Sequence, residues 1–186
     1  MKRIIDIIGS FLLILILFFP FVLISLIIFL SDGLPIFYFS KRIGKNNNIF
    51  FMPKFRTMKN NTPQVATHLF SDPEKYLLPI GNLLRKTSID ELPQIFSILL
   101  GHMTFIGPRP ALYNQNDLIK LRSKLNIHKL TPGLTGYAQV NGRDDLSIEK
   151  KVDLDYYYYL NRSFLLDVKI ILKTFIVIIF KKNVKH

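Results

Sequence analysis

The feature that most constrains this chain is a long segment without charge near its start. Residues 7–31 contain no charged side chain, and residues 11–30 are apolar apart from Pro20 and Ser25. A helix of that length measures about 30 Å, which matches the hydrocarbon core of a bilayer. The segment is too long for the apolar region of a signal peptide, and no small-residue cleavage site follows it. Residues 1–31 therefore predict a membrane-inserted helix.

Two features leave the topology of that helix open. Pro20 lies in the middle of the apolar segment, where a proline removes a backbone donor and clashes with the preceding turn. Basic residues also flank the segment on both sides, at positions 2 and 3 and at positions 41, 42 and 45. Because cytoplasmic flanks are enriched in basic residues, this distribution favours neither orientation of a spanning helix. A re-entrant helix, which bends at Pro20 and returns to the cytoplasmic side, satisfies both flanks.

The charge and hydropathy of the chain favour an anionic membrane as its partner. The 186 residues include 25 Lys and Arg against 13 Asp and Glu, which gives a net charge of +12, and 49% are hydrophobic. This pairing fits a basic protein on a membrane surface better than a nucleic-acid-binding protein. The absence of cysteine excludes disulfides and thiolate metal sites, and the four histidines lack the spacing of a zinc site.

The densest set of reactive side chains lies at residues 85–91, with the sequence RKTSIDE. Two cations and two hydroxyls precede the adjacent carboxylates of Asp90 and Glu91. An apolar pattern at helical spacing follows and stops at Gly101, so a helix is predicted from near Asp90 to about residue 100. Its cap is either Ser88, in a capping box with Glu91, or Asp90, since Pro93 is tolerated only in a first turn.

This stretch has a structural and a chemical interpretation. Acidic residues in a first helical turn stabilise the helix dipole, and such caps are common. The free N–H groups of a helix start also bind phosphate, and Arg85 would assist. Because neighbouring helical residues diverge by about 100°, Asp90 and Glu91 cannot serve the same atom. One carboxylate could attack phosphorus while the other holds a metal.

Further candidate phosphate-binding cations lie on a strand and in two turns. Residues 49–58 predict the second of two strands, in which alternation places Lys54 and Arg56 on one face. The GPRP sequence at 107–110 gives Arg109 a rigid mount, and the NGR turn at 141–143 presents Arg143. Each also has an ordinary explanation as a solvated strand edge or turn. Arginine in a rigid mount is suited to a bidentate grip on phosphate.

The remaining chain is predicted to be mostly helical. Residues 34–40 predict the first strand, residues 131–136 a turn-rich loop and residues 137–140 a short strand. Helices are predicted at 74–84, 116–126, 148–160 and 164–182. The last of these mixes apolar and basic residues, as expected of an interfacial helix on an anionic leaflet. The predicted fold is α+β and mostly helical, with a membrane helix at 1–31, a catalytic domain at 32–163 and an interfacial segment at 164–186.

Taken in order, these motifs resemble the bacterial sugar transferase family, the small monotopic polyprenyl-phosphate phosphoglycosyl transferases. The similarity extends over essentially the whole chain. The motifs that carry it are KFRTM at 54–58, RKTSIDEL at 85–92, GPRP at 107–110 and PGLTGYAQVNGR at 132–143. Each motif alone is weak, whereas their combination in this order is specific.

The resemblance implies a reaction and its surroundings. A sugar 1-phosphate would pass from a UDP-sugar to polyprenyl (undecaprenyl) phosphate with release of UMP, as the first membrane step of surface glycan biosynthesis. The enzyme would act on the cytoplasmic face of the bacterial inner membrane, with the inner leaflet as a partner and no nucleic acid. A second copy of the chain and later glycosyltransferases of the pathway are the protein partners that it suggests.

The resemblance also implies roles for matching residues. Asp90 would be the nucleophile and Glu91 the ligand of Mg²⁺. Arg85, Arg109 and Arg143 would bind phosphate. Pro20 would bend the re-entrant helix, although Phe19 stands where the family often has serine before this proline. Tyr137 stands where the family often has tryptophan, which keeps an aromatic ring with a polar tip.

Two other functions fit parts of the pattern. A membrane-bound phosphohydrolase would use the same aspartate with water as the acceptor, and would release free sugar phosphate. A basic binding module for lipid or nucleic acid would bind with a steep salt dependence and would not need Asp90. The acids interspersed among the cations, and the proline-fixed arginine, argue against the binding module.

Overall fold

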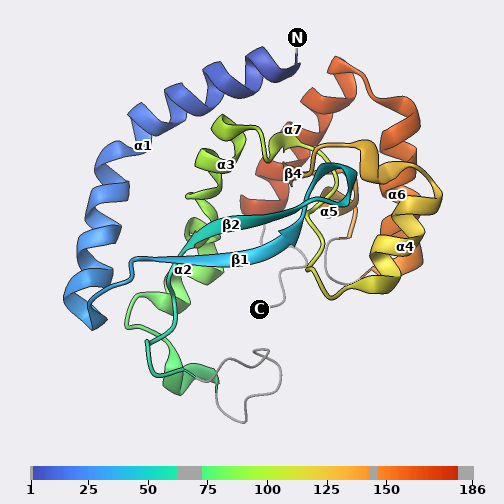
Figure 1. The fold of residues 1–186 in the computed structure, drawn as a ribbon. Helices are drawn as coiled ribbons and strands as arrows, with labels where there is room; N and C mark the ends of the chain where they lie inside the picture. The colour runs from blue at the N-terminus through green and yellow to red at the C-terminus, as the bar shows by residue number, and fades with distance from the viewer. Residues whose placement is uncertain (1, 63–72, 143–145, 180–186) are drawn as a thin grey trace.

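The computed structural model describes residues 2–62, 73–142 and 146–179. These residues are mostly helical and carry two small two-stranded sheets, which confirms the predicted α+β class (Figure 1). The strands are β1 (Phe37–Ile43), β2 (Ile49–Phe55), β3 (Thr104–Ile106) and β4 (Gly133–Thr135). The α-helices are α1 (Lys2–Asp32), α2 (Gly81–Thr87), α3 (Gln94–Leu100), α4 (Asn116–Lys124), α5 (Tyr137–Val140), α6 (Ile148–Asn161) and α7 (Phe164–Ile179).

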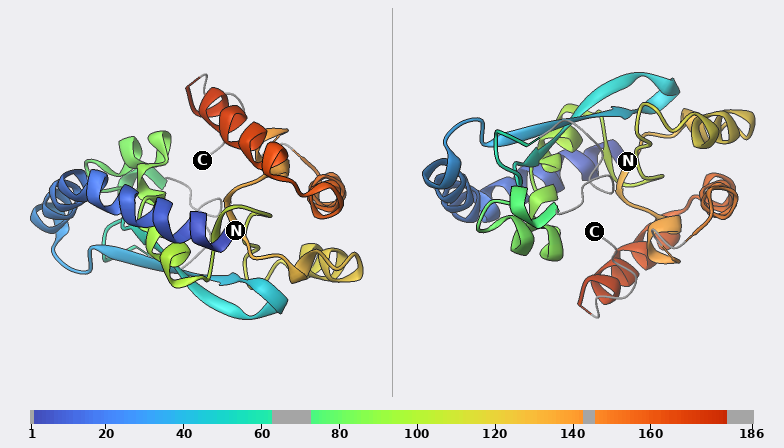
Figure 2. Two further views of the ribbon diagram at one scale, coloured as in Figure 1. Left: turned by 90° about the horizontal axis from the view of Figure 1, so that it is seen from above. Right: turned by 90° about the horizontal axis from the view of Figure 1, so that it is seen from below.

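The N-terminal helix α1 is long and largely exposed. It contains Pro20 and is bent in its middle, so that its two arms border two sides of the body (Figures 1 and 2). Its length and apolarity suffice to cross a membrane, and only 11% of its most apolar window is buried. Pro20 leaves the carbonyl of Ile16 without its usual helical donor. After the bend, the Ser25 hydroxyl donates to the carbonyl of Phe21 at 2.7 Å.

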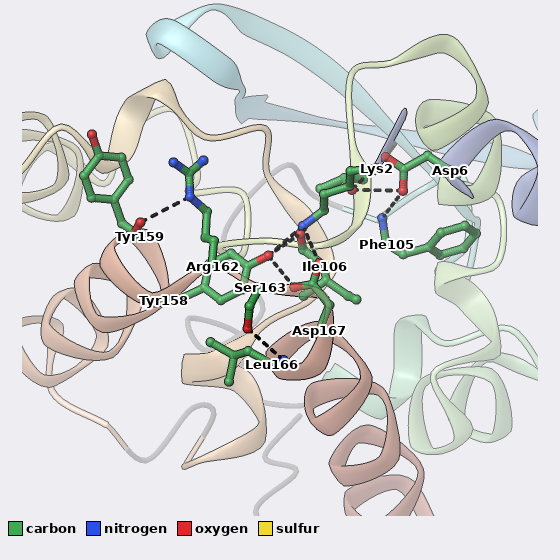
Figure 3. Close-up of polar contacts among 11 residues, drawn as sticks. Lys2, Asp6, Phe105, Ile106, Tyr158, Tyr159, Arg162, Ser163, Leu166 and Asp167 are labelled. Carbon is green, nitrogen blue, oxygen red and sulfur yellow. Dashed lines mark hydrogen bonds and ion pairs between the residues drawn. The ribbon is translucent and has the colours of Figure 1, made fainter. Parts of the chain in front are cut away.

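The first turns of α1 are clamped to the body by three charged residues, Lys2, Arg3 and Asp6, here called the N-terminal clamp. Both carboxylate oxygens of Asp6 accept from the Thr104 hydroxyl, at 2.9 and 2.8 Å, and one also accepts from the Phe105 N–H. Asp6 is only 5% exposed, so these bonds replace the water that a carboxylate otherwise needs (Figure 3). The sequence of α1 thus joins an apolar helix to a polar anchor.

The other two members of the clamp hold α3, α6 and α7. Arg3 donates to the carbonyls of Ile98 and Leu99 at 2.6 and 2.7 Å, and so satisfies the C-terminal end of α3. Lys2 donates to the Tyr158 hydroxyl at 2.6 Å and pairs with Asp167 at 3.1 Å (Figure 3). Tyr158 in turn donates to Asp167, at 2.7 Å. Burial and the Asp167 carboxylate both raise the pKa of Tyr158, so its hydroxyl remains a donor.

The last turn of α1 is held by the same body. Asp32 forms an ion pair with Arg56, and the Arg56 guanidinium also donates to the carbonyls of Asp32 and Gly33. Ile24 and Ile28 pack in one core cluster with Phe55, Leu78 and Leu84. Both ends of α1 therefore contact the part of the chain between residues 32 and 167.

Three glycines bring two distant motifs into backbone contact. Strands β3 and β4 pair in parallel, with Thr104 opposite Gly133. A Cβ atom on Gly133 would lie 2.1 Å from the Gly107 nitrogen, and one on Gly136 would lie 2.1 Å from the Gly107 oxygen. No side chain fits at these distances, so glycine is required at both positions. This contact fixes the place of the GPRP segment that follows Gly107.

Several predicted elements are confirmed. The predicted strands at 34–40 and 49–58 form the antiparallel hairpin of β1 and β2, with Tyr38 opposite Lys54 and Arg42 opposite Phe50. The predicted helices at 116–126 and 148–160 correspond to α4 and α6, and that at 164–182 corresponds to α7 as far as residue 179, beyond which it lies outside the described residues. Ser147 caps α6 by accepting from the Lys150 N–H.

Two predictions are wrong. Residues 137–140 form helix α5, and the strand lies earlier, at Gly133–Thr135, inside the predicted loop. The glycine contact draws β4 against β3, and this tertiary pairing outweighs the strand propensity of the following residues. The predicted helix at 74–84 is also interrupted, because Pro79 cannot occupy a helix interior; a 3₁₀ turn at Pro73–Tyr76 is followed by α2.

Candidate functional site

The carboxylates of Asp90 and Glu91 lie on one tight turn between two helices. Ser88 ends α2 in a left-handed conformation, with φ 58°, and the 3₁₀ turn Ile89–Glu91 follows. Helix α3 begins only at Gln94. The predicted cap by Ser88 or Asp90 is therefore wrong: Ser88 makes no side-chain cap, and neither residue stands at the start of α3. Pro93 has no N–H to donate to Ile89, whose carbonyl accepts from Leu92 instead.

Four predicted site residues meet in what we call the carboxylate cluster: Lys54, Asp90, Glu91 and Arg109. The Lys54 amine lies 2.7 Å from Glu91 Oε1 and 3.7 Å from Asp90 Oδ2. Arg109 Nη2 lies 3.1 Å from the same Glu91 oxygen. The cluster thus combines a cation from β2, a cation from the GPRP segment and two carboxylates from the turn.

Glu91 is held in its ionised form. Burial raises the pKa of Glu91, but the charges of Arg109 and Lys54, together with their hydrogen bonds, lower it by more than burial raises it. The pKa of Glu91 therefore lies well below the usual range. Both cations bind Oε1, while Oε2 accepts no hydrogen bond from the residues that the structure describes. Glu91 therefore offers a charged oxygen atom to a cation or donor outside this network.

The other predicted phosphate-binding cations lie at different places. Arg85 donates to the Thr57 hydroxyl at 2.9 Å; burial lowers its pKa, while the nearby charge of Asp90 acts in the opposite direction. Arg85 is thus placed on the Asp90 side of the cluster. Arg56 lies apart from it, because its guanidinium is engaged at the end of α1. Arg143 lies outside the described residues.

A charged pocket adjoins the cluster and was not foreseen from the sequence. This basic pocket has a volume of about 210 Å³ and lies among β1, the GPRP segment, α4, α5 and α6. It is lined by Arg42, Arg109, Pro110, Ala111, Gln115, Leu118, Arg122, Ala138, Gln139 and Lys151. Alternation in the hairpin could have identified Arg42, because its side chain shares a face with that of Lys54. Gln139 lies within the motif at 132–143 but was assigned no role, and Lys151 carried no comparable signal.

Two apolar grooves lie along α3. One, of about 420 Å³, runs between α1 and α3 and includes Phe21 and Phe96 in its lining. The other, of about 490 Å³, lies between the hairpin and α3 and includes Pro53, Pro93 and again Phe96. Pro53 precedes Lys54 in the chain, and Pro93 lies two residues after Glu91. The carboxylate cluster is therefore close in sequence to an apolar groove and shares Arg109 with the basic pocket.

Comparison with known proteins finds one matching family and several named relatives. The family model for bacterial sugar transferases matches residues 1–181. An uncharacterized sugar transferase, EpsL, of Bacillus subtilis is 41% identical over 145 residues, which cover 78% of this chain and 70% of the relative. The exopolysaccharide production protein ExoY of Sinorhizobium fredii is 36% identical over 188 residues, with 93% and 83% covered.

A third relative is named for its reaction. The UDP-glucose:undecaprenyl-phosphate glucose-1-phosphate transferase of Escherichia coli is 34% identical over 183 residues. The aligned region covers 94% of this chain but only 39% of that relative. The similarity is thus confined to a part of the longer protein.

The cation pair around Glu91 generates a prediction about pH. Replacing Lys54 with Met removes one charge and one hydrogen bond, so the pKa of Glu91 should rise towards the ordinary value of about 4.3. Because the native pKa of Glu91 is depressed, its contribution to stability is present above about pH 4.3 and declines as the pH falls further. The fall in unfolding temperature between pH 5 and pH 2 should therefore be smaller in Lys54→Met than in the wild type.

The measurement is a thermal unfolding series across that pH range, with ¹³C detection of the Glu91 carboxyl resonance. Lys41→Met is the matched control, because Lys41 lies on the opposite face of β1, with its amine 4.9 Å from the Tyr113 ring centre. An unchanged Glu91 titration in Lys54→Met would contradict the assigned cause of the shift.

Proposed function

The chain belongs to the bacterial sugar transferase family, and on this premise we propose that it transfers a sugar 1-phosphate from a UDP-sugar to polyprenyl phosphate, with Asp90 as the covalent nucleophile. The observation that carries the proposal is the carboxylate cluster. It presents two adjacent carboxylates with cations from two other segments, 2.7 Å and 3.1 Å from Glu91. A diphosphate donor needs such cations to offset its charge during phosphoryl transfer.

The proposed reaction has two displacement steps at one phosphorus atom. An Asp90 oxygen attacks the phosphorus that carries the sugar, and the bond from that phosphorus to the bridging oxygen breaks. The bonding electrons leave with UMP. A phosphate oxygen of the polyprenyl acceptor then attacks the same phosphorus, the bond to Asp90 breaks, and Asp90 is restored as a carboxylate. The product is a polyprenyl-diphosphate sugar.

The cations have distinct parts in this proposal. A carboxylate is repelled by an anionic phosphate, so Lys54, which lies 3.7 Å from Asp90, would reduce that repulsion as the two approach. Arg109 would hold a phosphate oxygen beside Glu91, and Arg85 would act from the Asp90 side. The partial burial of Asp90 and Glu91 strengthens each of these interactions relative to water.

The residues present fit a bound Mg²⁺. The described residues contain no group of three or more carboxylate, histidine or cysteine ligands, whereas Mg²⁺ commonly uses one or two carboxylates with substrate phosphates and water. Glu91 Oε2 is the oxygen available for this purpose. When bound, the ion would neutralise charge on the diphosphate.

We also propose that α1 is re-entrant and that the enzyme lies on the cytoplasmic face of the inner membrane. Support comes from the attachment of both ends of α1 to one body, through Asp6 at its start and Asp32 at its end. A spanning helix would place these ends on opposite sides of a bilayer about 30 Å thick. Exposed apolar side chains on α7, such as Leu172 and Phe175, suit an interfacial position.

The nucleophile assignment predicts a separable first step. Asp90→Asn should lower turnover by about a thousandfold or more, because the covalent route is lost. Wild-type enzyme given UDP-sugar alone should release close to one equivalent of UMP per enzyme, and Asp90→Asn should release none. The control is Asp117→Asn, an exposed acid on α4. Turnover by Asp90→Asn at the wild-type rate would contradict the assignment, and continuous release of sugar phosphate without acceptor would indicate a hydrolase.

The metal proposal makes a separate prediction. A chelator should abolish wild-type turnover, and added Mg²⁺ should restore it. Glu91→Gln should raise the Mg²⁺ concentration required for half-maximal rate by about tenfold or more. The control is Glu149→Gln, in the first turn of α6. A wild-type rate that is unaffected by chelation would refute the role of the metal.

The topology prediction uses the absence of cysteine from the chain. One cysteine is added ahead of Met1, which leaves the N-terminal clamp intact, and another replaces the exposed Lys45. Both should react with an impermeant reagent in inside-out vesicles, and neither should react in intact cells. Opposite labelling would show a spanning helix. Pro20→Leu should increase the spanning fraction, since it restores the backbone donor.

A further inference from the structure

The basic pocket contains a cation, Arg42, that has no ion-pair partner among the described residues. The Arg42 guanidinium is partly buried and donates to the Ser40 hydroxyl at 3.0 Å and to the Pro110 carbonyl at 3.3 Å. Among the described residues, no carboxylate lies within ion-pair distance of Arg42. Withdrawing an uncompensated charge from water costs free energy.

A second guanidinium increases this cost. Burial and, next, the charge of Arg109 lower the pKa of Arg42 to about 10, only partly offset by attraction to Glu91. Arg42 therefore remains charged at neutral pH, beside a like charge. Lys151 adds a third cation to the lining, while Arg122 is already paired with Asp155. Such a cation set is stabilised by an anion bound between its members.

The walls of the pocket indicate more than a bare anion. The lining combines apolar residues, Pro110, Ala111, Leu118 and Ala138, with the two amides Gln115 and Gln139. A heterocyclic base joined to ribose needs this combination of apolar wall and a few polar groups. The two grooves along α3 are lined largely by apolar side chains and would leave the polar atoms of a nucleoside unpaired.

The pocket adjoins the carboxylate cluster and shares Arg109 with it. Arg109 both lines the pocket and binds Glu91, so a phosphate held by Arg109 can extend from the cluster into the pocket. Helices α4 and α6, which border the pocket, lie on the side of the body opposite to the bend of α1 (Figures 1 and 2). A ligand that occupies this pocket thus leaves the α1 side of the cluster open to a lipid.

We propose that the basic pocket binds the nucleoside monophosphate half of the donor, with Arg42 as a phosphate-binding residue and Gln139 and Lys151 as further binding residues. The inference rests on the proposed function for the identity of the donor. It assigns the donor nucleotide and the polyprenyl chain to opposite sides of the carboxylate cluster. UMP then departs through the pocket without crossing the path of the acceptor.

The test measures UMP binding by calorimetry, with the full chain in lipid nanodiscs. Arg42→Gln should weaken UMP binding by about tenfold to a hundredfold, the effect of losing a charge-assisted hydrogen bond. Lys151→Ala should weaken it by several-fold. The matched controls are Lys41→Gln and Lys150→Ala, each one residue away, and both should bind UMP like the wild type. Gln139→Ala tests the amide separately, and unfolding temperatures confirm that each variant is folded.

The outcomes separate this inference from the proposed function. UMP binding that Arg42→Gln leaves unchanged overturns the pocket assignment, even if Asp90→Asn abolishes transfer. UMP binding that depends on Arg42 supports the pocket, even if no sugar phosphate is transferred. Inorganic phosphate is the comparison ligand: binding as tight as that of UMP would reduce the pocket to an anion site and overturn the assignment of the nucleoside. Asp90→Asn should retain UMP binding, because Asp90 is not part of the pocket lining.

Discussion

A single carboxylate oxygen, Glu91 Oε1, joins three segments that are far apart in the sequence. It accepts from Lys54 on β2 and from Arg109 in the GPRP segment, and it belongs to the turn between α2 and α3. The position of each partner depends on separate packing. The hairpin register positions Lys54, and the contact of Gly107 with Gly133 and Gly136 positions the loop that carries Arg109. The charge balance at Glu91 is thus the point on which these separate parts of the fold converge.

The same organisation separates polar from apolar chemistry around the cluster. Arginines and amides border it through the basic pocket, whereas aromatic and aliphatic side chains line the grooves along α3. A reaction between a water-soluble donor and a lipid acceptor needs both environments at one place. The fold provides them through the two faces of one hairpin: Arg42 and Lys54 share one face, and Phe39 and Pro53 share the other.

Sequence reasoning identified what depends on local pattern and on spaced motifs. The membrane-length helix followed from absence of charge, and the hairpin followed from alternation and a turn. Asp90, Glu91, Lys54 and Arg109 were found as motif members, and the structure brings them together.

What sequence reasoning missed depends on tertiary contacts. The position of β4 follows from close backbone approach to β3, which no local propensity encodes. The predicted capping box is absent because Ser88 is left-handed and the 3₁₀ turn Ile89–Glu91 separates it from α3, which begins only at Gln94. The basic pocket is assembled from β1, α4, α5 and α6, so only the assembled fold reveals it. Asp6 was overlooked because a lone acid beside an apolar run carries no pattern, yet it is among the most buried carboxylates.

Helix α3 contacts α1 at two places. Arg3 binds the carbonyls at its C-terminal end, and Phe21, in the second arm of α1, contacts the ring of Phe96 with centroids 5.5 Å apart. The turn that carries Asp90 and Glu91 leads directly into α3. A movement of α1 would therefore shift α3 and, with it, the turn that carries the carboxylate pair. If α1 lies in a bilayer, as proposed above, a change in bilayer thickness or lateral pressure would reach the site through these two contacts.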